Sequence, residues 1–395
     1  MTASGSRDQL WRPPSEPFVP PPYPYDRLDA YKPLAEAFEG GCVDLSIGTP
    51  VDPPPAAAVE ALGHSDAERG YPPSIGTLPL RQAVQRWIGR RFDVDVDPSA
   101  IGACIGTKEF VASLPNWMKL RRPDRDTVLY PEIAYPTYEM GAIFAGCRAV
   151  PVPVDEQWRI RLDAIDEADA ARALLLWVNT PGNPAGGLDD LEAAAAWGRA
   201  RGVPVFSDEC YAEFTWQGEP RSILQADRAL PTGTARFKGL IAVHSLSKRS
   251  NFAGCRLGYY AGDAELVYYL QEVRKHAGMM VPGPVQAAGI AALDDDEHVA
   301  RQRKLYHDRL LLGQAVFARL GVTAPMPEGG FYLWVPAPDG DAWGLTERLA
   351  REAGALISPG EFYGAAGSTY VRVAMVQPDD KLRLVAERVG VPVSV

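Results

Sequence analysis

The regular alternation of short apolar runs with helix-length amphipathic stretches over residues 60–290 constrains the fold more than any other feature of this sequence. Strands that alternate with helices of this length indicate βαβ units and a sheet covered on both faces. The pattern predicts an α/β fold with a mostly parallel, seven-stranded sheet. The predicted strands are Ile101–Ile105, Thr127–Tyr130, Arg148–Val152, Ala173–Val178, Val203–Ser207, Leu240–Ser245 and Arg256–Ala261. The predicted helices between them include Lys108–Leu120, Thr137–Ala145, Asp189–Arg201 and Ala264–His276.

The connection between the last two predicted strands is unusually short. Parallel neighbours need a crossover of a dozen or more residues, usually containing a helix. The segment from Ser245 to Arg256 is too short for such a helix. We therefore expect these two strands to be antiparallel neighbours joined by a functional turn.

The two ends of the chain differ from the central region. Residues 1–24 hold seven prolines between Trp11 and Pro24, which favours an extended chain: a flexible tail at 1–10, and at 11–24 either a continuation of that tail or an arm that lies on a partner subunit. After residue 290 the pattern changes to longer helices and a few short strands, and we expect the segment Val43–Ile47 to join them from the N-terminal side. We expect a Pro-rich arm at 1–24, a large domain at 58–289, and a smaller α+β domain formed by 25–57 and 290–395.

Charge and cysteine usage exclude several classes of protein. The 40 basic and 50 acidic residues give a net charge of −10, which argues against a nucleic-acid partner. No apolar stretch approaches the ~18 residues that a membrane span requires. The five cysteines and five histidines are scattered, so the sequence predicts neither a disulfide framework nor a metal site. We expect a cytoplasmic protein.

Four predicted strands end in polar or glycine-rich turns. Ligands of open α/β sheets bind outside the carboxyl ends of the strands, so these turns would meet at one edge. Each turn alone also fits ordinary turn or capping chemistry. Four of them at one edge indicate a ligand site. The turns begin at Gly106, Asn179, Asp208 and Leu246.

Two of these turns and a nearby arginine have the chemistry of a phosphate site. The start of a helix presents backbone N–H groups and a dipole that favour an anion. Serine and threonine hydroxyls add donors, and a guanidinium adds a bidentate contact. The candidate phosphate ligands are Gly106, Thr107, Lys108, Ser245, Ser247 and Arg256.

The other polar residues at this edge suit an aromatic aldehyde. Asp208 offers a carboxylate for a protonated ring nitrogen, and Tyr211 and Asn183 offer hydrogen bonds to a phenolate oxygen. Lys248, in a dry site, would have a lowered pKa and attack an aldehyde as a nucleophile. A phosphate, a ring nitrogen, a phenolate and a lysine-reactive aldehyde together describe pyridoxal 5′-phosphate, PLP.

At these residues the chain resembles the class I/II, fold-type-I PLP-dependent aminotransferases, from about Leu45 to Val373. The Asp208–Tyr211 segment is similar to the family's Asp-x-x-Tyr element. The Ser245–Lys248 segment, followed by Gly254–Gly258, resembles its lysine motif. Asn183–Gly186 is similar to Asn-Pro-Thr-Gly, with Ala185 in place of threonine, a change from which we expect little loss.

The resemblance implies roles for the cofactor-binding residues. Lys248 would form the internal aldimine and move the proton at the substrate carbon in a ping-pong reaction. Asp208 would stabilise the pyridinium, and Tyr135 would stack on the ring. Tyr71 matches a tyrosine that reaches the phosphate of the neighbouring subunit, which implies a homodimer with shared active sites.

The resemblance also implies how the substrate is held. Arg372 matches the arginine that binds the substrate α-carboxylate, and Gly48 matches a glycine that approaches the same group. Asn183 would lie between the cofactor and the substrate.

Three further strings look most like bacterial succinyldiaminopimelate aminotransferases. They span Ser247–Gly254, Met280–Ala288 and Ser358–Gly364. This likeness implies amino exchange between N-succinyl-L,L-diaminopimelate and 2-oxoglutarate in lysine and diaminopimelate biosynthesis. The sequence does not identify the residue that selects the succinyl group or distal carboxylate; Arg249 is a candidate, and an arginine beside the lysine is equally a surface or dimer contact.

Other functions remain open from the sequence. The alternatives within the fold are an aminotransferase for aspartate, aromatic amino acids or LL-diaminopimelate, and a PLP-dependent C–S lyase. Outside catalysis, the alternatives are a PLP-sensing regulator and a degenerate binding protein. The regulator would need a DNA-binding module larger than the 24 residues of the arm, and the presence of both Lys248 and Asp208 argues against degeneration.

Overall fold

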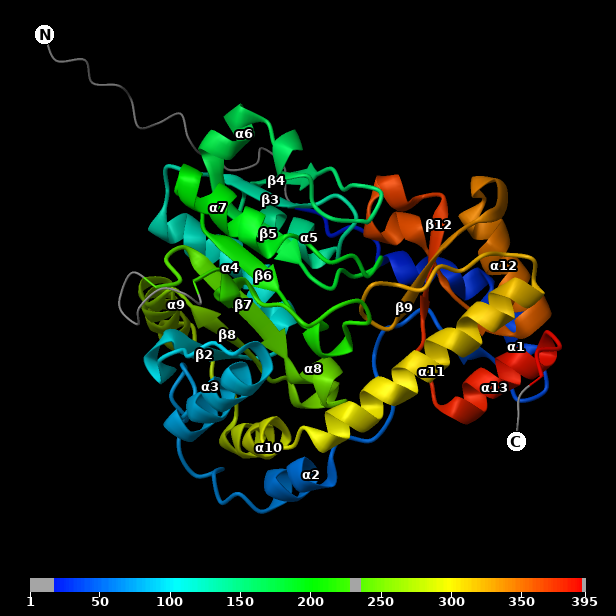
Figure 1. Cartoon of the computed structure of the whole chain (residues 1–395), viewed down its shortest axis with the longest axis horizontal. Coiled ribbons are helices and arrows are strands. Elements are labelled where there is room, and N and C mark those ends of the chain that lie inside the picture. Colours follow the sequence, from blue (N-terminus) through cyan, green and yellow to red (C-terminus); the bar gives the residue numbers. More distant parts are fainter. Residues whose placement is uncertain (1–17, 228–235, 393–395) are drawn as a thin grey trace, which may run out of the picture.

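The computed structural model describes residues 18–227 and 236–392, and its largest element is a seven-stranded sheet between helices (Figure 1). The strand order is β2-β8-β7-β6-β5-β3-β4, and every pair that does not involve β8 is parallel. This arrangement confirms the predicted fold class. The strands are β2 (Ile101–Cys104), β3 (Thr127–Pro131), β4 (Arg148–Val152), β5 (Ala173–Asn179), β6 (Val205–Asp208), β7 (Leu240–Ser245) and β8 (Gly258–Gly262).

The predicted antiparallel pair is confirmed, with one correction at its second strand. β8 runs antiparallel to β7 and to β2. Arg256 was expected to begin this strand, but β8 begins at Gly258. Arg256 has a left-handed backbone with φ of 56°. A residue in this conformation cannot continue an extended ladder, so Arg256 belongs to the turn before β8.

Helices cover both faces of the large sheet because successive side chains of a strand point to opposite faces. In β5 all seven residues are buried. Leu176 and Val178 join one core cluster, whereas Leu175 and Trp177 join the cluster on the other face. The helices of the first cluster are α3 (Leu78–Phe92), α7 (Leu191–Arg201) and α10 (Gly283–Leu293), and those of the second are α4 (Thr107–Arg121), α5 (Thr137–Phe144) and α9 (Ala264–His276).

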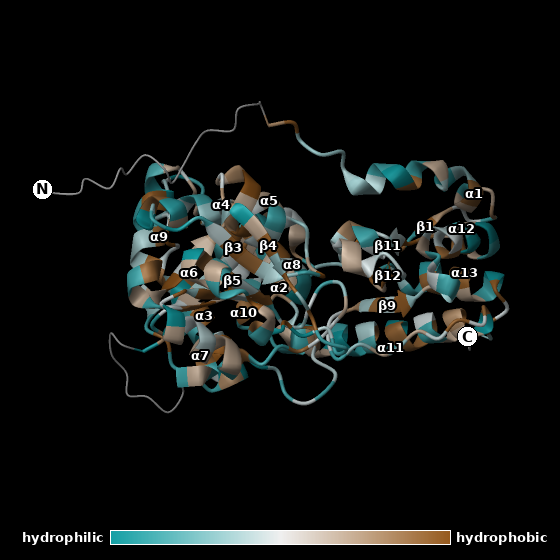
Figure 2. Ribbon diagram, turned by 90° about the horizontal axis from the view of Figure 1, so that it is seen from above, coloured by the Kyte–Doolittle hydropathy of each residue, from teal (hydrophilic) through white to brown (hydrophobic). Residues whose placement is uncertain are grey.

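A second group of elements lies beside the large sheet (Figure 2). It contains the three-stranded antiparallel sheet β11-β12-β9 and the parallel pair β1-β10, which joins Val43 to Ala355 from opposite ends of the chain. Its elements are α1 (Lys32–Glu36), β1 (Val43–Asp44), α11 (Glu297–Arg319), β9 (Tyr332–Pro336), α12 (Ala342–Ala353), β10 (Ala355–Leu356), β11 (Ser358–Pro359), β12 (Tyr370–Ala374) and α13 (Asp379–Arg388). The shared core of both chain ends supports the proposed division into a domain of residues 58–289 and a domain of 25–57 and 290–395.

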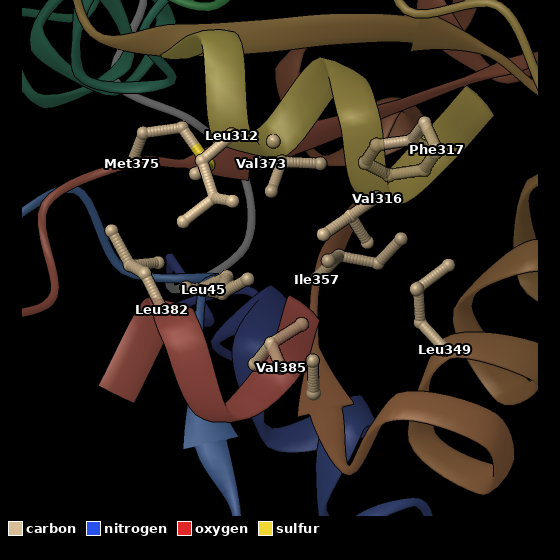
Figure 3. A pocket seen from close by; sticks show the side chains of 12 residues that line it. Leu45, Leu312, Val316, Phe317, Leu349, Ile357, Val373, Met375, Leu382 and Val385 are labelled. Carbon is tan, nitrogen blue, oxygen red and sulfur yellow. The ribbon is translucent and has the colours of Figure 1, made fainter. Parts of the chain in front are cut away.

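The core of this second group contains a small cavity of about 20 Å³ (Figure 3). Its lining comes from α11, α12, α13 and the adjoining strands, and includes Leu45, Val316, Phe317, Leu349, Val373 and Leu382. A cavity of this size could hold about one water molecule, but a buried water needs polar partners. Because the lining is apolar, we interpret this space as a packing defect rather than a binding site.

The N-terminal arm is described only from Phe18. Residues 1–17 lie outside the described residues, and so does most of the predicted Pro-rich segment. Phe18 meets Phe144 of α5 edge-on, with ring centroids 5.9 Å apart. The chain then enters a 3-10 helix, η2 (Pro24–Ala30), which adjoins the site described below. Within the described ranges, no helix has the length and hydropathy needed to cross a membrane.

Candidate active site

Lys248 lies in a short helix, α8 (Leu246–Arg249), that directly follows β7. The Ser245 hydroxyl caps this helix by accepting a hydrogen bond of 3.0 Å from the Ser247 N–H. The Lys248 ammonium donates to the carbonyl oxygen of Gly48. Burial, helped by the positive charges of Arg372 and Arg256, lowers the pKa of Lys248 to about 8. The lysine is therefore held in place and partly neutral near physiological pH.

The lowered pKa of Lys248 predicts its reactivity in the cofactor-free protein. The rate of modification by an amine-reactive acylating reagent should rise with pH through a midpoint near 8, because only the neutral amine attacks. Lys32 is a control, since its hydrogen bond to Asp29 raises its pKa above the ordinary value. Peptide mapping by mass spectrometry at several pH values would measure both rates. A Lys248 profile that follows Lys32 would contradict the effect of burial.

Asp208 ends β6 as a buried carboxyl group. Its Oδ2 accepts a hydrogen bond of 2.9 Å from the Tyr138 hydroxyl, and its Oδ1 accepts one of 3.2 Å from the Cys210 N–H. Burial raises the pKa of Asp208, and these hydrogen bonds oppose the rise. Among the described residues, no cation forms a salt bridge with this carboxyl group. Burying a carboxylate without a cationic partner costs free energy, and a ligand with a protonated nitrogen would offset that cost. The site therefore fits such a ligand.

The N-terminus of α4 and Arg256 form an anion site. Gly106 precedes the helix with φ of 73°, and no side chain caps the helix. A Cβ at Gly106 would lie 2.2 Å from Nη2 of Arg256, so the guanidinium lies directly against this turn. The Gly106 N–H donates to the Cys104 carbonyl oxygen at 2.8 Å, so the predicted contact of this amide with a phosphate stays a prediction. The Thr107 and Lys108 amides, the Thr107 hydroxyl and Arg256 remain, and this donor set fits a phosphate.

An ion pair between the buried Arg274 and the partly buried Glu109 fixes the first turn of α4 against α9. Two guanidinium nitrogens of Arg274 donate to the two carboxylate oxygens of Glu109, each at 2.8 Å. Arg274→Met should lower the free energy of unfolding by about 1.5–3 kcal/mol, because it removes the charged hydrogen bonds to a partly buried carboxylate that keeps only the Ser113 hydroxyl and the Ile105 N–H as donors. Urea denaturation would measure this loss. The double variant Arg274→Met with Glu109→Met should recover much of it, and equal instability of the two variants would contradict the ion-pair explanation.

Arg372 lies in β12 and is buried. Its Nη1 donates to Oδ1 of Asn183 at 3.0 Å, and its Nη2 donates to the Ser46 carbonyl oxygen at 2.6 Å and the Tyr25 hydroxyl at 3.3 Å. The rings of Tyr332 and Tyr363 lie 4.3 and 4.5 Å from its guanidinium carbon. This guanidinium is thus held at the Lys248 site as a fixed positive group.

Tyr211 and Gly48 meet at a residue that the sequence did not single out, Tyr332. The hydroxyl oxygens of Tyr211 and Tyr332 lie 3.0 Å apart. A Cβ at Gly48 would lie 2.0 Å from the Tyr332 hydroxyl, which gives a steric reason for glycine at this position. Gly48 therefore admits Tyr332 on one side and binds Lys248 through its carbonyl group.

Tyr135 and Tyr71, which are both predicted to contact the cofactor, lie in different surroundings. Tyr135 is half-buried, and the Lys108 ammonium lies 6.0 Å from its ring centroid. The Asp208 charge acts on the Tyr135 hydroxyl, whose pKa is raised by burial. Tyr71 is 97% exposed, so this chain alone does not bring it into the site.

Several residues at the site were not predicted. They are Tyr25, Ser46, Tyr138, Tyr332 and Tyr363. Tyr138 could have been found from its spacing, because it follows Tyr135 by three residues, about one helical turn. The other four come from elements more than 150 residues away from Lys248 or beyond residue 330, and no local motif marks them.

Arg249 was a candidate selector of the substrate side chain, and the structure contradicts this. Its guanidinium is buried and donates to Glu213, to the Ala292 carbonyl oxygen and to Asp296 at distances of 3.1, 2.7 and 3.0 Å. These acceptors pair the positive charge of the Arg249 guanidinium within the protein core. Arg249 is therefore a structural residue.

The arrangement matches known proteins in sequence and structure. The profile of the family "Aminotransferase class I and II" matches residues 41–389. The chain is 41% identical over 371 residues to a 4-dedimethylamino-4-oxo-anhydrotetracycline transaminase of Streptomyces rimosus, covering 93% of this chain and 98% of that protein. It is 36% identical over 385 residues to an LL-diaminopimelate aminotransferase of Aquifex aeolicus, covering 94% and 96%.

A solved structure shows the same fold over nearly the whole chain. A probable N-succinyldiaminopimelate aminotransferase of Thermus thermophilus superimposes with a TM-score of 0.81 at 31% identity, covering 92% of this chain and 98% of that one. The phosphate donors at α4, the Asp208 carboxyl group, which forms no salt bridge with a described cation, and the partly neutral Lys248 fit PLP, the cofactor of this family. The chain therefore belongs to the class I and II aminotransferases, has the fold-type-I architecture and uses pyridoxal phosphate.

Proposed function

We propose that this aminotransferase exchanges the amino group of N-succinyl-L,L-diaminopimelate with 2-oxoglutarate in a ping-pong reaction. One observation carries this proposal beyond the family. The exposed Lys108 ammonium lies 6.0 Å from the ring centroid of Tyr135, so a second cation adjoins the site in addition to the buried Arg372. Such a pair suits a substrate with carboxylates at both ends.

PLP, when bound, supplies an aldehyde that accepts the amino group and a ring that withdraws electrons. The proposed phosphate ligands are Thr107, Lys108, Ser245, Ser247 and Arg256. Asp208 would hold the protonated ring nitrogen, Tyr135 would cover the ring, and Tyr211 and Asn183 would donate to its phenolate oxygen. Lys248 would move the proton at the substrate carbon, because its amine is partly neutral near pH 8.

The substrate α-carboxylate would bind to Arg372. Its guanidinium is already oriented by Asn183, Ser46 and two tyrosine rings, so little side-chain entropy is lost on binding. Gly48 keeps the backbone close to this position. A bound carboxylate would replace the weaker contact from Arg372 to the Tyr25 hydroxyl.

We further propose a homodimer in which Tyr71 completes the phosphate site of the partner subunit. The support is that Tyr71 is almost fully exposed on the single chain, although it matches a family position that binds cofactor. Large apolar side chains near it in sequence, including Leu78 and Val59, are also half exposed. All five cysteines are free, which supports the proposal of a reducing, cytoplasmic setting.

A panel of amino donors with 2-oxoglutarate tests the substrate proposal. The panel contains N-succinyl-L,L-diaminopimelate, LL-diaminopimelate, acetylornithine, glutamate, aspartate and aromatic amino acids. We expect the succinylated donor to have the highest kcat/KM, and Lys108→Gln to raise KM for it more than for aromatic donors. A preference for any other donor would contradict the proposal.

LL-diaminopimelate is the second candidate donor. The similarity to the Aquifex aeolicus LL-diaminopimelate aminotransferase favours it. The two donors differ at the distal amine, which is a cation in LL-diaminopimelate and a neutral amide in the succinylated donor. The same panel separates them, because a site built around the exposed Lys108 should favour the donor with the anionic succinyl group.

Arg372→Leu tests the carboxylate site. We expect kcat/KM for amino-acid donors to fall by about 10- to 150-fold, because a hydrogen bond to a charged group contributes roughly 1.5–3 kcal/mol. Steady-state kinetics would show the loss chiefly as a raised KM. A primary amine without a carboxylate is the control, and its slow reaction should be unchanged. An equal loss for the amine would indicate damage to the whole site.

A further inference from the structure

The hydroxyl groups of Tyr211 and Tyr332 form a buried pair, with their oxygens 3.0 Å apart. The two side chains are only 6% and 2% exposed. Burial raises the pKa of both phenols, so both stay protonated at neutral pH. The pair has two hydroxyl hydrogens, but only one of them can lie between the two oxygens. The other hydrogen needs an acceptor elsewhere.

We propose that Tyr332 is a positioning residue that donates its hydrogen to Tyr211, which leaves the Tyr211 hydrogen for the phenolate oxygen of bound PLP. This inference rests on the role proposed above for Tyr211. If Tyr211 donates to the phenolate, its oxygen can only accept from Tyr332, so the direction of the pair is fixed. Because hydrogen bonds in a chain polarise one another, Tyr332 strengthens the bond from Tyr211 to the cofactor.

The fold holds the Tyr332 hydroxyl in place from three sides. Its backbone is in register with Ala374 of β12. The Arg372 guanidinium lies over its ring, 4.3 Å from the centroid. On the third side the hydroxyl lies so close to Gly48 that any Cβ there would be 2.0 Å away. The hydroxyl therefore has little freedom to turn away from Tyr211.

Other titratable groups face the Tyr211–Tyr332 pair, and their effects must be distinguished from the effect of the pair itself. Arg372 lies on β12, Cys210 precedes Tyr211, and Tyr25 and Tyr135 act on Tyr332. Lys248 reaches the Gly48 carbonyl oxygen beside the Tyr332 hydroxyl. A change at Tyr332 could disturb the cations Arg372 and Lys248 directly. Only a comparison with and without Tyr211 isolates the proposed relay.

The test is a pH titration of the visible absorption band of the PLP-loaded protein. Tyr211→Phe should move the midpoint of this titration to higher pH by about 1–2 units. Without the hydrogen bond from Tyr211, the phenolate oxygen of PLP holds the proton that it shares with the Lys248 nitrogen more tightly. Tyr332→Phe should move the midpoint in the same direction by about 0.2–0.6 units. In the Tyr211→Phe background, Tyr332→Phe should cause no further shift.

Two outcomes would overturn the relay: no shift for Tyr332→Phe, or an equal shift in both backgrounds. If Tyr211→Phe itself causes no shift, the role proposed for Tyr211 fails, whichever donor the enzyme prefers. Tyr306→Phe is the matched control, because Tyr306 lies in the same aromatic cluster but donates to Asn251. If Tyr332→Phe does not fold, the same titration can be done on protein with 3-fluorotyrosine in place of Tyr332. Its more acidic hydroxyl should move the midpoint to lower pH, and an unchanged or raised midpoint would contradict the relay.

Discussion

Lys248→Ala is expected to reduce transamination by at least about a thousandfold, because a positioned acid–base group contributes roughly 10²–10⁴ in rate and covalent attachment of the cofactor is also lost. The physical basis is the buried amine at the end of β7, whose pKa is lowered to about 8 by burial. Single-turnover kinetics with a reactive donor would measure the loss. The variant should fold normally, since it loses a single side-chain hydrogen bond, the one from Lys248 to the Gly48 carbonyl oxygen.

A chemical experiment on the unmodified protein accompanies this variant. We expect the PLP-loaded protein to be yellow, and borohydride to remove its visible absorbance and leave the cofactor on Lys248. Peptide mapping would locate the label. Lys304→Ala is the matched control, because Lys304 is exposed on α11 and forms a salt bridge with Asp308. A label on another lysine, or substantial turnover by Lys248→Ala, would refute the assigned role.

Asp208→Asn is expected to have the second largest effect. The cofactor ring withdraws electrons only while its nitrogen is protonated, and a neutral amide does not stabilise that charge. We expect kcat to fall by about 10²–10³, the usual cost of removing one electrostatic contact to a developing charge. Cofactor affinity should weaken by about 10- to 150-fold, as expected for a lost charged hydrogen bond. Absorbance titration with PLP and single-turnover kinetics would measure the two effects.

Asp189→Asn separates this effect from the general cost of altering a desolvated carboxyl group. Asp189 accepts hydrogen bonds from two backbone N–H groups, and desolvation raises its pKa to about 7. An amide oxygen can accept from only one of these two N–H groups, so Asp189→Asn should lower stability, but cofactor affinity should change little because Asp189 is not among the proposed cofactor ligands. If both variants lose affinity equally, Asp208 has no special relation to the cofactor nitrogen.

The fold and the centre of the site are largely predictable from local patterns. Strands and helices differ in hydrophobic period, so the alternation over residues 60–290 was enough to predict the sheet. Asp208 and Lys248 could be found because they lie at or just after the ends of strands, and strand ends of a parallel sheet meet at one edge. Arg256 shows the limit of this reasoning, since its left-handed backbone places it before the strand that it was expected to begin.

The sequence by itself therefore determined the fold class, the cofactor and the residues that lie at strand ends. Only the tertiary structure decided which side chains surround them. Tyr332 and Tyr25 lie on elements whose approach depends on packing between distant segments. Packing likewise buried Arg249 against Glu213 and Asp296, although its place beside Lys248 suggested a substrate contact. Periodicity is a local property, whereas such partnerships arise only when separate elements pack together.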